Sequence, residues 1–201
     1  MISQLEFVRM VDVQSETIEK YIREGKIIPD MSVPINDRRC FNYFKHGTIK
    51  LYANKFGWDL VTASNIKDKF MQFVEKMDMS FSYKPVLLKA LLDHMDKDGK
   101  VRICDIVDYF IDFYESRKAQ GLPIEKSTSI YHKGTYTRKD VEHNILANPF
   151  KRFADMRFLQ RCKDISIIEL NPTILKKISQ SDKALIVDIC DRKLTEYYAR
   201  R

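Results

Sequence analysis

The stretch SETIEKYIREGKIIP, residues 15–29, decides the fold of the first part of the chain. It predicts a short helix over Glu16–Glu24, which Ser15 caps with its hydroxyl and which the following glycine ends. Residues 4–11 predict a second short helix, so Asp12–Gln14 is expected to form a tight turn between the two. Two short helices joined in this way present the second helix to the major groove of DNA. The sequence therefore predicts a helix-turn-helix near its beginning.

Residues 15–29 resemble the recognition-helix segment of the MerR and excisionase group, in which a Thr-(Ile/Leu)-x-x-(Tyr/Trp) core precedes Glu-Gly and Ile-x-Pro. The downstream stretch RRCFNYF, residues 38–44, is similar to the wing strand of that family, and a short helix is expected after it over Thr48–Phe56. The resemblance implies a MerR-like winged helix-turn-helix over residues 1–62.

The wing departs from the family pattern. Asp37-Arg38-Arg39 stands where the family usually has Gly-Tyr-Arg, and it follows a long loop expected over residues 30–36. The family also continues into a long coiled-coil dimerisation helix, whereas the helix expected after Ser64 is short. A reshaped wing is therefore expected, and dimeric, effector-dependent activation is not.

The resemblance implies that the second helix and the wing contact DNA, the helix through base edges and the wing through phosphates. The implied contacts are Gln14, Ser15, Thr17, Lys20 and Arg23 on the helix, and Arg38, Arg39 and Lys45 near the wing. Glu16, Glu19 and Glu24 share the same helix and would repel phosphate if they faced it. Use of the same fold for docking to a protein therefore stays open.

Beyond residue 62, a connecting helix is expected over 63–81 and a second domain over 82–201. The fold class is predicted as mainly α with small β wings (α+β), and the second domain is also compatible with a winged helix. The expected helices cover residues 84–95, 103–119, 138–147, 150–162 and 182–198, and the expected strands or hairpins cover 127–136 and 165–170. Thr137 and Asp140 predict a capping box, and Asn171-Pro172 predicts a helix start.

The second domain carries a looser resemblance. The segments 82–92 and 113–117 resemble accessory segments attached to bacterial restriction and helicase-type defence proteins. The likeness implies a setting in mobile-element or antiviral biology and gives no functional residues.

Basic residues are concentrated at the end of the chain. The net charge is +7, and residues 150–201 contain 12 Lys and Arg against 7 Asp and Glu. The densest cluster lies among phenylalanines and contains Lys151, Arg152, Arg157, Arg161 and Lys163. Its cations are candidates for phosphate contact, whereas the phenylalanines do not separate onto a clean face and are expected in the core.

Four carboxylates, Asp105, Asp108, Asp112 and Glu115, fall on one face of the helix expected over 103–119. A solvated acidic face is the favoured interpretation, and a docking face for a protein partner is the next. A divalent metal site for phosphodiester hydrolysis is disfavoured, because no second cluster of ligands has a place opposite it.

The sequence contains no motif typical of an enzyme active site or of a metal site. The chain lacks a P-loop, GxGxxG and GxSxG, and Asp96-Lys97-Asp98-Gly99 departs from a calcium loop at the first and last ligand positions. The cysteines (Cys40, Cys104, Cys162 and Cys190) and the histidines are scattered without metal-ligand spacing, so mostly buried, reduced thiols are expected. No metal, cofactor or catalysis is predicted.

The sequence contains neither a long apolar run nor a secretory leader, which predicts a cytoplasmic protein. The predicted function is non-catalytic binding of double-stranded DNA, with a role in transcription regulation or recombination in a bacterial, phage or mobile-element setting. The alternative is a protein-interaction module, either a subunit of an anti-phage defence complex or a phage-coded inhibitor of one.

Overall fold

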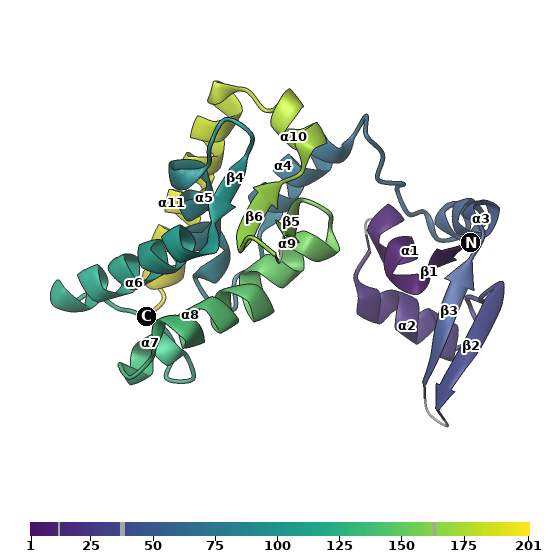
Figure 1. The fold of residues 1–201 in the computed structure, drawn as a ribbon, viewed down its shortest axis with the longest axis horizontal. Coiled ribbons are helices and arrows are strands. Elements are labelled where there is room, and N and C mark those ends of the chain that lie inside the picture. Colours follow the sequence, from purple (N-terminus) through teal and green to yellow (C-terminus); the bar gives the residue numbers. More distant parts are fainter. Residues whose placement is uncertain (12, 37–38, 163) are drawn as a thin grey trace. The chain divides into compact units, whose positions relative to one another are not determined.

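The computed structural model describes residues 1–11, 13–36, 39–162 and 164–201. It has a mixed α+β fold, which confirms the predicted α+β class. The chain divides into two compact units, Met1–Asn65 and Ile66–Arg201, and each contains a small antiparallel sheet (Figure 1).

The first unit begins with β1 (Ile2–Ser3), α1 (Gln4–Met10) and α2 (Ser15–Arg23). The elements that follow are β2 (Met31–Asn36), β3 (Arg39–Phe44) and α3 (His46–Phe56), and the antiparallel strands lie in the order β1-β3-β2. The loop expected over 30–36 is therefore wrong. Alternate residues of this segment are apolar, which is the period of a strand, and β2 pairs with β3. Asp12, expected in the turn after α1, lies outside the described residues.

An aromatic core holds α1 against β3. Phe7 and Phe44 are fully buried, and their rings meet edge to face with centroids 4.8 Å apart. Tyr21, Phe56 and Trp58 form a second group of rings, in which the Phe56 centroid lies 4.9 Å from that of Tyr21 and 4.9 Å from that of Trp58. The two groups together fix α2 and α3 on the same core.

Polar side chains fix the turn that leads into the hairpin. The Tyr52 hydroxyl accepts a hydrogen bond from the Ile28 amide at 2.8 Å. The Asp30 carboxylate accepts one from the Lys45 amide at 2.9 Å and one from the Thr48 hydroxyl at 3.0 Å. Asp30 therefore satisfies a free amide at the start of α3 and ties the beginning of the hairpin to its end.

The second unit is built around α5 (Tyr83–His94), which is buried on most of its circumference. Helices α6 (Ile103–Ala119) and α11 (Gln180–Tyr198) pack against it, and α4 (Ile66–Lys76) packs against α11. The only helix of the expected connecting segment, 63–81, is thus part of the second unit. Among the described residues, no helix combines the length and the apolar content that a membrane crossing requires.

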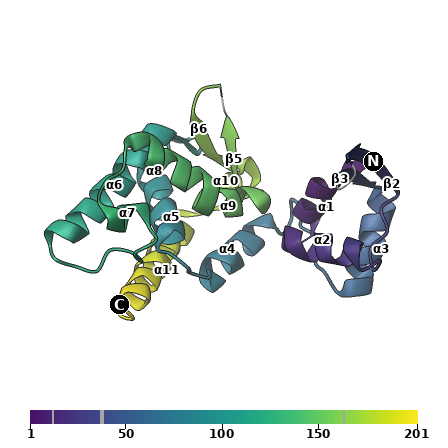
Figure 2. The same ribbon diagram turned by 90° about the horizontal axis from the view of Figure 1, so that it is seen from below.

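The sheet of the second unit contains β4 (Lys100–Arg102), β5 (Leu159–Cys162) and β6 (Ile167–Leu170) in the order β4-β6-β5. Strands β5 and β6 form a hairpin at one edge of this unit (Figure 2). The remaining elements are α7 (Ile130–Lys133), α8 (Arg138–Ile145), the π-helical turn η1 (Leu146–Phe150), α9 (Lys151–Asp155) and α10 (Pro172–Lys177).

The strand or hairpin expected over 127–136 is wrong, because the segment forms the short helix α7. The Ser129 hydroxyl accepts a hydrogen bond from the Tyr131 amide at the start of α7, and Gly134 ends it with a φ of 72°. Tyr131 is buried and stacks on Tyr114 with centroids 3.9 Å apart. This tertiary contact overrides the β propensity of the segment.

The single helix expected over 150–162 is also wrong. The helix ends at Asp155, Arg157 adopts a φ of 60°, and the chain continues into β5. Leu159 pairs with Leu170, so the pairing with β6, which is distant in sequence, decides the conformation. Pro149 neither ends nor opens a helix, because it lies inside the π-helical turn.

The starts of α8 and α10 agree with the sequence. Thr137 and Asp140 form both hydrogen bonds of the predicted capping box. The Asn171 side chain caps α10 by accepting from the Thr173 amide, and Pro172 occupies the first turn. These predictions are confirmed because caps use groups within one turn of each other.

The cysteines depart from the expectation of mostly buried thiols. Cys40, Cys104 and Cys162 are exposed, and Cys190 is buried in α11. Burial raises the pKa of the Cys190 thiol to about 12. Cys190 therefore remains protonated at neutral pH.

The core of the first unit predicts a sharp contrast along α1. Phe7→Ala removes a fully buried ring, so we expect the first unit to lose about 3–5 kcal/mol of stability. Leu5→Ala, where the side chain is 49% exposed, is expected to cost less than about 0.5 kcal/mol. Urea unfolding followed by the fluorescence of Trp58, the single tryptophan, measures both changes. Equal losses in the two variants would contradict this core assignment.

Candidate nucleic-acid interface

Helix α2 is anchored to the first unit by Ile18, which is fully buried. The helix begins one residue earlier than expected: Gln14 is the N-cap residue, and no side chain caps this end. The predicted Ser15 cap is therefore wrong, because the serine lies inside the first turn. Gly25, with a φ of 68°, ends the helix as the sequence indicated.

The residues of α2 that were predicted to contact DNA differ in exposure. Gln14, Lys20 and Arg23 are exposed, whereas Ser15 and Thr17 are half-buried. Arg23 has no carboxylate within ion-pair distance among the described residues. Its guanidinium is thus available to a ligand.

One of the acidic residues near α2 is neutralised within the protein. The Glu24 carboxylate lies 2.7 Å from the Lys26 ammonium and 3.9 Å from that of Lys20. The hydrogen bond from Lys26 lowers the pKa of Glu24. Glu19 remains exposed on the helix, so the polar face of α2 has mixed charge.

The residues predicted to contact DNA near a wing belong to the same unit as α2. Arg39 is exposed at the start of β3, and Lys45 is exposed directly before α3. The backbone amide of Lys45 donates a hydrogen bond to the Asp30 carboxylate, which fixes the position of the residue. The Lys45 side chain is exposed. Arg38, the third predicted contact, lies outside the described residues.

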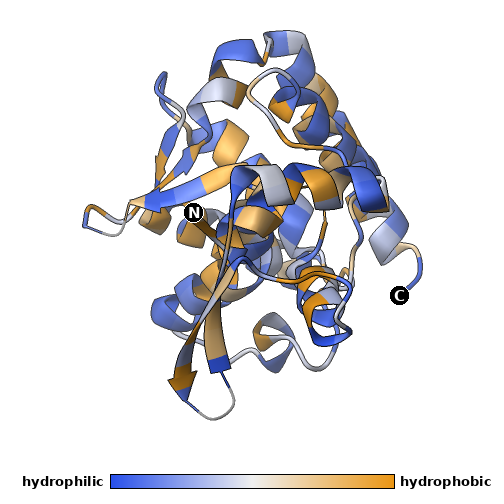
Figure 3. Cartoon of the chain, turned by 90° about the vertical axis from the view of Figure 1, so that its right-hand side faces the viewer, coloured by the Kyte–Doolittle hydropathy of each residue, from blue (hydrophilic) through white to orange (hydrophobic). Residues whose placement is uncertain are grey.

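The β2–β3 hairpin exposes an apolar face. Cross-strand pairs place Met31 opposite Tyr43 and Val33 opposite Phe41 on the same side of the sheet. Val33 is 42% exposed and Phe41 is 57% exposed. Figure 3 shows the apolar colour along this hairpin. The hairpin therefore presents a hydrophobic surface where the wing of a DNA-binding protein would be polar.

The other face of the hairpin is polar and contacts α1. The Ser32 hydroxyl donates to the Asn42 side-chain oxygen at 2.8 Å, and the Asn42 amide donates to Gln4 at 2.8 Å. These hydrogen bonds fix which face of the hairpin points away from the unit. The exposure of the apolar face is thus set by the fold.

The basic cluster of the second unit is partly neutralised. Lys151 forms an ion pair with Asp155 at 3.1 Å, and Arg161 forms one with Glu142 at 3.3 Å. Arg152 lies over the ring of Phe73. Because the chain changes from α9 to β5 within this cluster, its cations do not form one helical face.

The rest of that cluster has structural roles. Arg157 occupies the left-handed turn before β5, where its carbonyl accepts a hydrogen bond from Asn171 at 2.9 Å. Phe150, Phe153 and Phe158 are at most 9% exposed and belong to the core. They are not available for stacking on bases. Lys163 lies outside the described residues.

The acidic face on α6 is also largely paired. Arg102 donates to both oxygens of Asp105, and Arg138 forms an ion pair with Asp108. These hydrogen bonds lower the pKa of each carboxyl group. Glu115 accepts a hydrogen bond from the Tyr136 hydroxyl at 2.7 Å and lies 3.9 Å from the Lys118 ammonium, so Asp112 is the carboxylate of this face that has no ion pair among the described residues. The face offers a weaker acidic surface than its sequence indicated.

A buried polar network in the second unit was missed at the sequence level. Glu125, only 5% exposed, lies between α6 and α7. One of its oxygens accepts from the Ser82 amide at 2.7 Å and from the Ser82 hydroxyl, and the other accepts from the Tyr197 hydroxyl at 2.6 Å. The carboxylate thus links the start of α5 to the end of α11.

Two further tyrosines complete the network. The Ser82 hydroxyl also contacts the hydroxyls of Tyr114 at 2.7 Å and Tyr198 at 2.9 Å. Burial raises the pKa of Tyr114, and it raises that of Tyr198 to about 12. Both phenols therefore stay protonated at neutral pH. No motif marks the network, because its members come from distant parts of the chain.

Among the described residues, no three His, Cys, Asp or Glu side chains are grouped so that they could hold a metal ion. Comparison of the chain with family models, with curated proteins and with solved structures gives no match. What can be inferred about function therefore depends on the geometry of these side chains.

The network predicts opposite outcomes for two buried tyrosines. Tyr197→Phe removes a donor to the buried Glu125 carboxylate, so we expect a loss of about 1–3 kcal/mol in unfolding free energy. Tyr131→Phe is the matched control. The Tyr131 hydroxyl is buried without a hydrogen-bond partner among the described residues, so its removal should be neutral or stabilising. Thermal unfolding of both variants provides the measurement, and a larger loss for Tyr131→Phe would overturn this view of the network.

Proposed function

We propose that the chain is a non-catalytic, double-stranded DNA-binding protein whose first unit is a MerR-like winged helix-turn-helix. One observation carries the proposal: α1 and α2 share a core, α2 presents Lys20 and Arg23 to solvent, and an exposed β2–β3 hairpin follows. This order of elements matches that of the family that residues 15–29 resemble.

The exposed residues suit different roles at DNA. Arg23 has a planar guanidinium and, in the described part of the chain, no partner carboxylate, so it is suited to the bidentate recognition of guanine. Arg39 and Lys45 flank β3 and are suited to phosphates beside the groove. The half-buried Ser15 and Thr17 would contribute only at the N-terminal end of α2, where a major groove approaches most closely.

We propose a cytoplasmic protein that regulates transcription or recombination in a bacterial, phage or mobile-element setting. The proposal assigns DNA contact to the first unit. In the second unit, the ion pairs of Lys151 and Arg161 argue against a phosphate surface built from the basic cluster.

A second candidate function, a protein-interaction module in antiviral defence or its inhibition, is favoured by the apolar face of the hairpin. Val33, Ile35 and Phe41 are each at least 42% exposed there. Apolar surface of this kind on a soluble fold commonly marks an interface. The acidic face of α6 favours this function less, because Arg102 and Arg138 neutralise two of its carboxylates.

DNA binding predicts a specific effect of reversing the charge at Arg23. We expect Arg23→Glu to weaken binding to a labelled duplex at least about tenfold, since a lost base contact costs about 1–3 kcal/mol. Lys50→Glu, an equal charge change at an exposed site of α3, is the control and should change affinity little. Fluorescence anisotropy across a salt series gives the affinity and the number of phosphates contacted. Absence of duplex binding by the unmodified protein at low salt would sink the proposal.

The two candidate functions differ in what the hairpin face does. We expect the double variant Val33→Ser/Phe41→Ser to stay folded, with stability changed by less than about 0.5 kcal/mol, because both side chains are exposed. If the face docks a protein, duplex affinity in the same anisotropy assay is unchanged. A clear loss of duplex affinity would instead assign the apolar face to DNA contact.

A further inference from the structure

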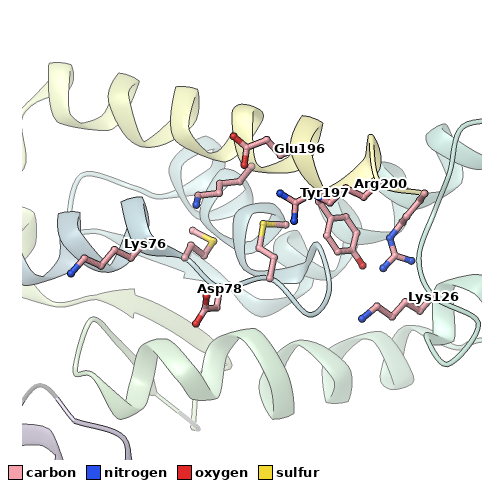
Figure 4. Close-up of a pocket in the computed structure, with 10 residues that line it drawn as sticks. Lys76, Asp78, Lys126, Glu196, Tyr197 and Arg200 are labelled. Carbon is pink, nitrogen blue, oxygen red and sulfur yellow. The ribbon is translucent and has the colours of Figure 1, made fainter.

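The second unit contains a cationic cavity that the proposed function does not use. Its volume is about 590 Å³, and α4, α11 and the loop before α7 line it (Figure 4). This volume lies in the range of small-molecule sites. The cavity is formed within one unit, so its shape does not depend on the first unit.

The charges of the cavity favour an anion. Its cationic side chains are Lys76, Lys126, Lys193, Arg200 and Arg201. The lining carboxylates, Asp78 and Glu196, leave an excess of three positive charges. Among the described residues, Lys76, Lys193 and Arg200 have no carboxylate within ion-pair distance. Like charges gathered without partners repel each other, and a bound polyanion would relieve that repulsion.

The floor of the cavity is rigid. Tyr197 projects from α11 into the space, with Lys126 on the side opposite α11 (Figure 4). The Tyr197 hydroxyl is fixed by its 2.6 Å hydrogen bond to Glu125, and the Arg201 guanidinium lies 4.3 Å from the centre of its ring. A fixed aromatic ring beside unpaired cations provides both an apolar surface and donors to a ligand.

We propose that this cavity binds a small molecule that carries two or more phosphate groups, such as a nucleoside di- or triphosphate. Lys126 approaches from one side, Lys193 approaches from α11, and Arg200 approaches from the residues that follow α11, so two phosphates can be contacted at once. Arginine matches phosphate geometry in a bidentate fashion, and lysine provides a mobile point charge. Met77 and Met79 line the same cavity and offer apolar contact to the rest of the molecule.

The test uses the full chain with two probes, tripolyphosphate and ATP, in isothermal titration calorimetry. We expect at least one probe to bind more tightly than about 1 mM. Lys193→Glu/Arg200→Glu should weaken that binding at least tenfold. The matched control, Lys133→Glu/Lys176→Glu, makes the same charge change at exposed sites outside the cavity and should bind as the unmodified protein does.

A neutral pair, Lys126→Gln/Arg200→Gln, guards against a folding defect of the reversed variant, and thermal unfolding checks each protein. Stronger binding of ATP than of tripolyphosphate identifies a nucleotide site, and equal binding identifies a site for the phosphate chain; both support the proposal. No binding of either probe at 1 mM, or equal weakening in the control pair, overturns it. The proposal is also overturned if the unmodified protein binds neither probe and the reversed variant binds a DNA duplex more weakly. That result assigns these cations to DNA.

Discussion

The second unit depends on the burial of one carboxylate. An ion placed in a protein interior loses its hydration, and the loss is tolerated only where hydrogen bonds replace the lost water. Glu125 receives such bonds from the Ser82 amide and hydroxyl and from Tyr197, so the start of α5 and the end of α11 must both be in place. Tyr197 forms the floor of the cationic cavity, and the buried carboxylate therefore also sets the geometry of that cavity.

The first unit depends on a different kind of constraint. Phe7 and Phe44 bring α1 onto β3, and Ile18 brings α2 onto the same core. Asp30 then bonds to the Lys45 amide and Thr48, which fixes where the hairpin leaves the unit and where it returns. Burial of apolar side chains thus sets which face of α2 is exposed to solvent. The two hydrogen bonds of Asp30 set the position of the hairpin.

Several features that depend on neighbouring residues could be predicted from the sequence, although the Ser15 cap of α2 was not one of them, and features that depend on distant residues could not. The capping box at Thr137 and the start of α10 at Asn171 follow from contacts within one turn. The sequence of residues 150–162 predicted one helix, yet pairing with β6 makes Leu159–Cys162 a strand. The same limit applies to the candidate sites. The exposed cations of α2 follow from its helical period, whereas Glu125 contacts Ser82 and Tyr197 only in the folded chain.

The basic excess of residues 150–201 illustrates why composition alone does not locate an anion-binding site. That excess pointed to the cluster around Arg157, where the sequence is densest in cations. In the folded chain, Lys151 and Arg161 form ion pairs with carboxylates, and Arg157 lies in a turn. The cluster therefore offers fewer unpaired cations to an anion than its sequence indicated. Lys193, in α11, and Arg200, which follows α11, are sparser in sequence, but the fold brings them to the same cavity as Lys76 and Lys126. Affinity for anions depends on which cations remain without carboxylate partners and lie close together, and our proposal assigns that role in this unit to the cavity that Lys76, Lys193 and Arg200 line.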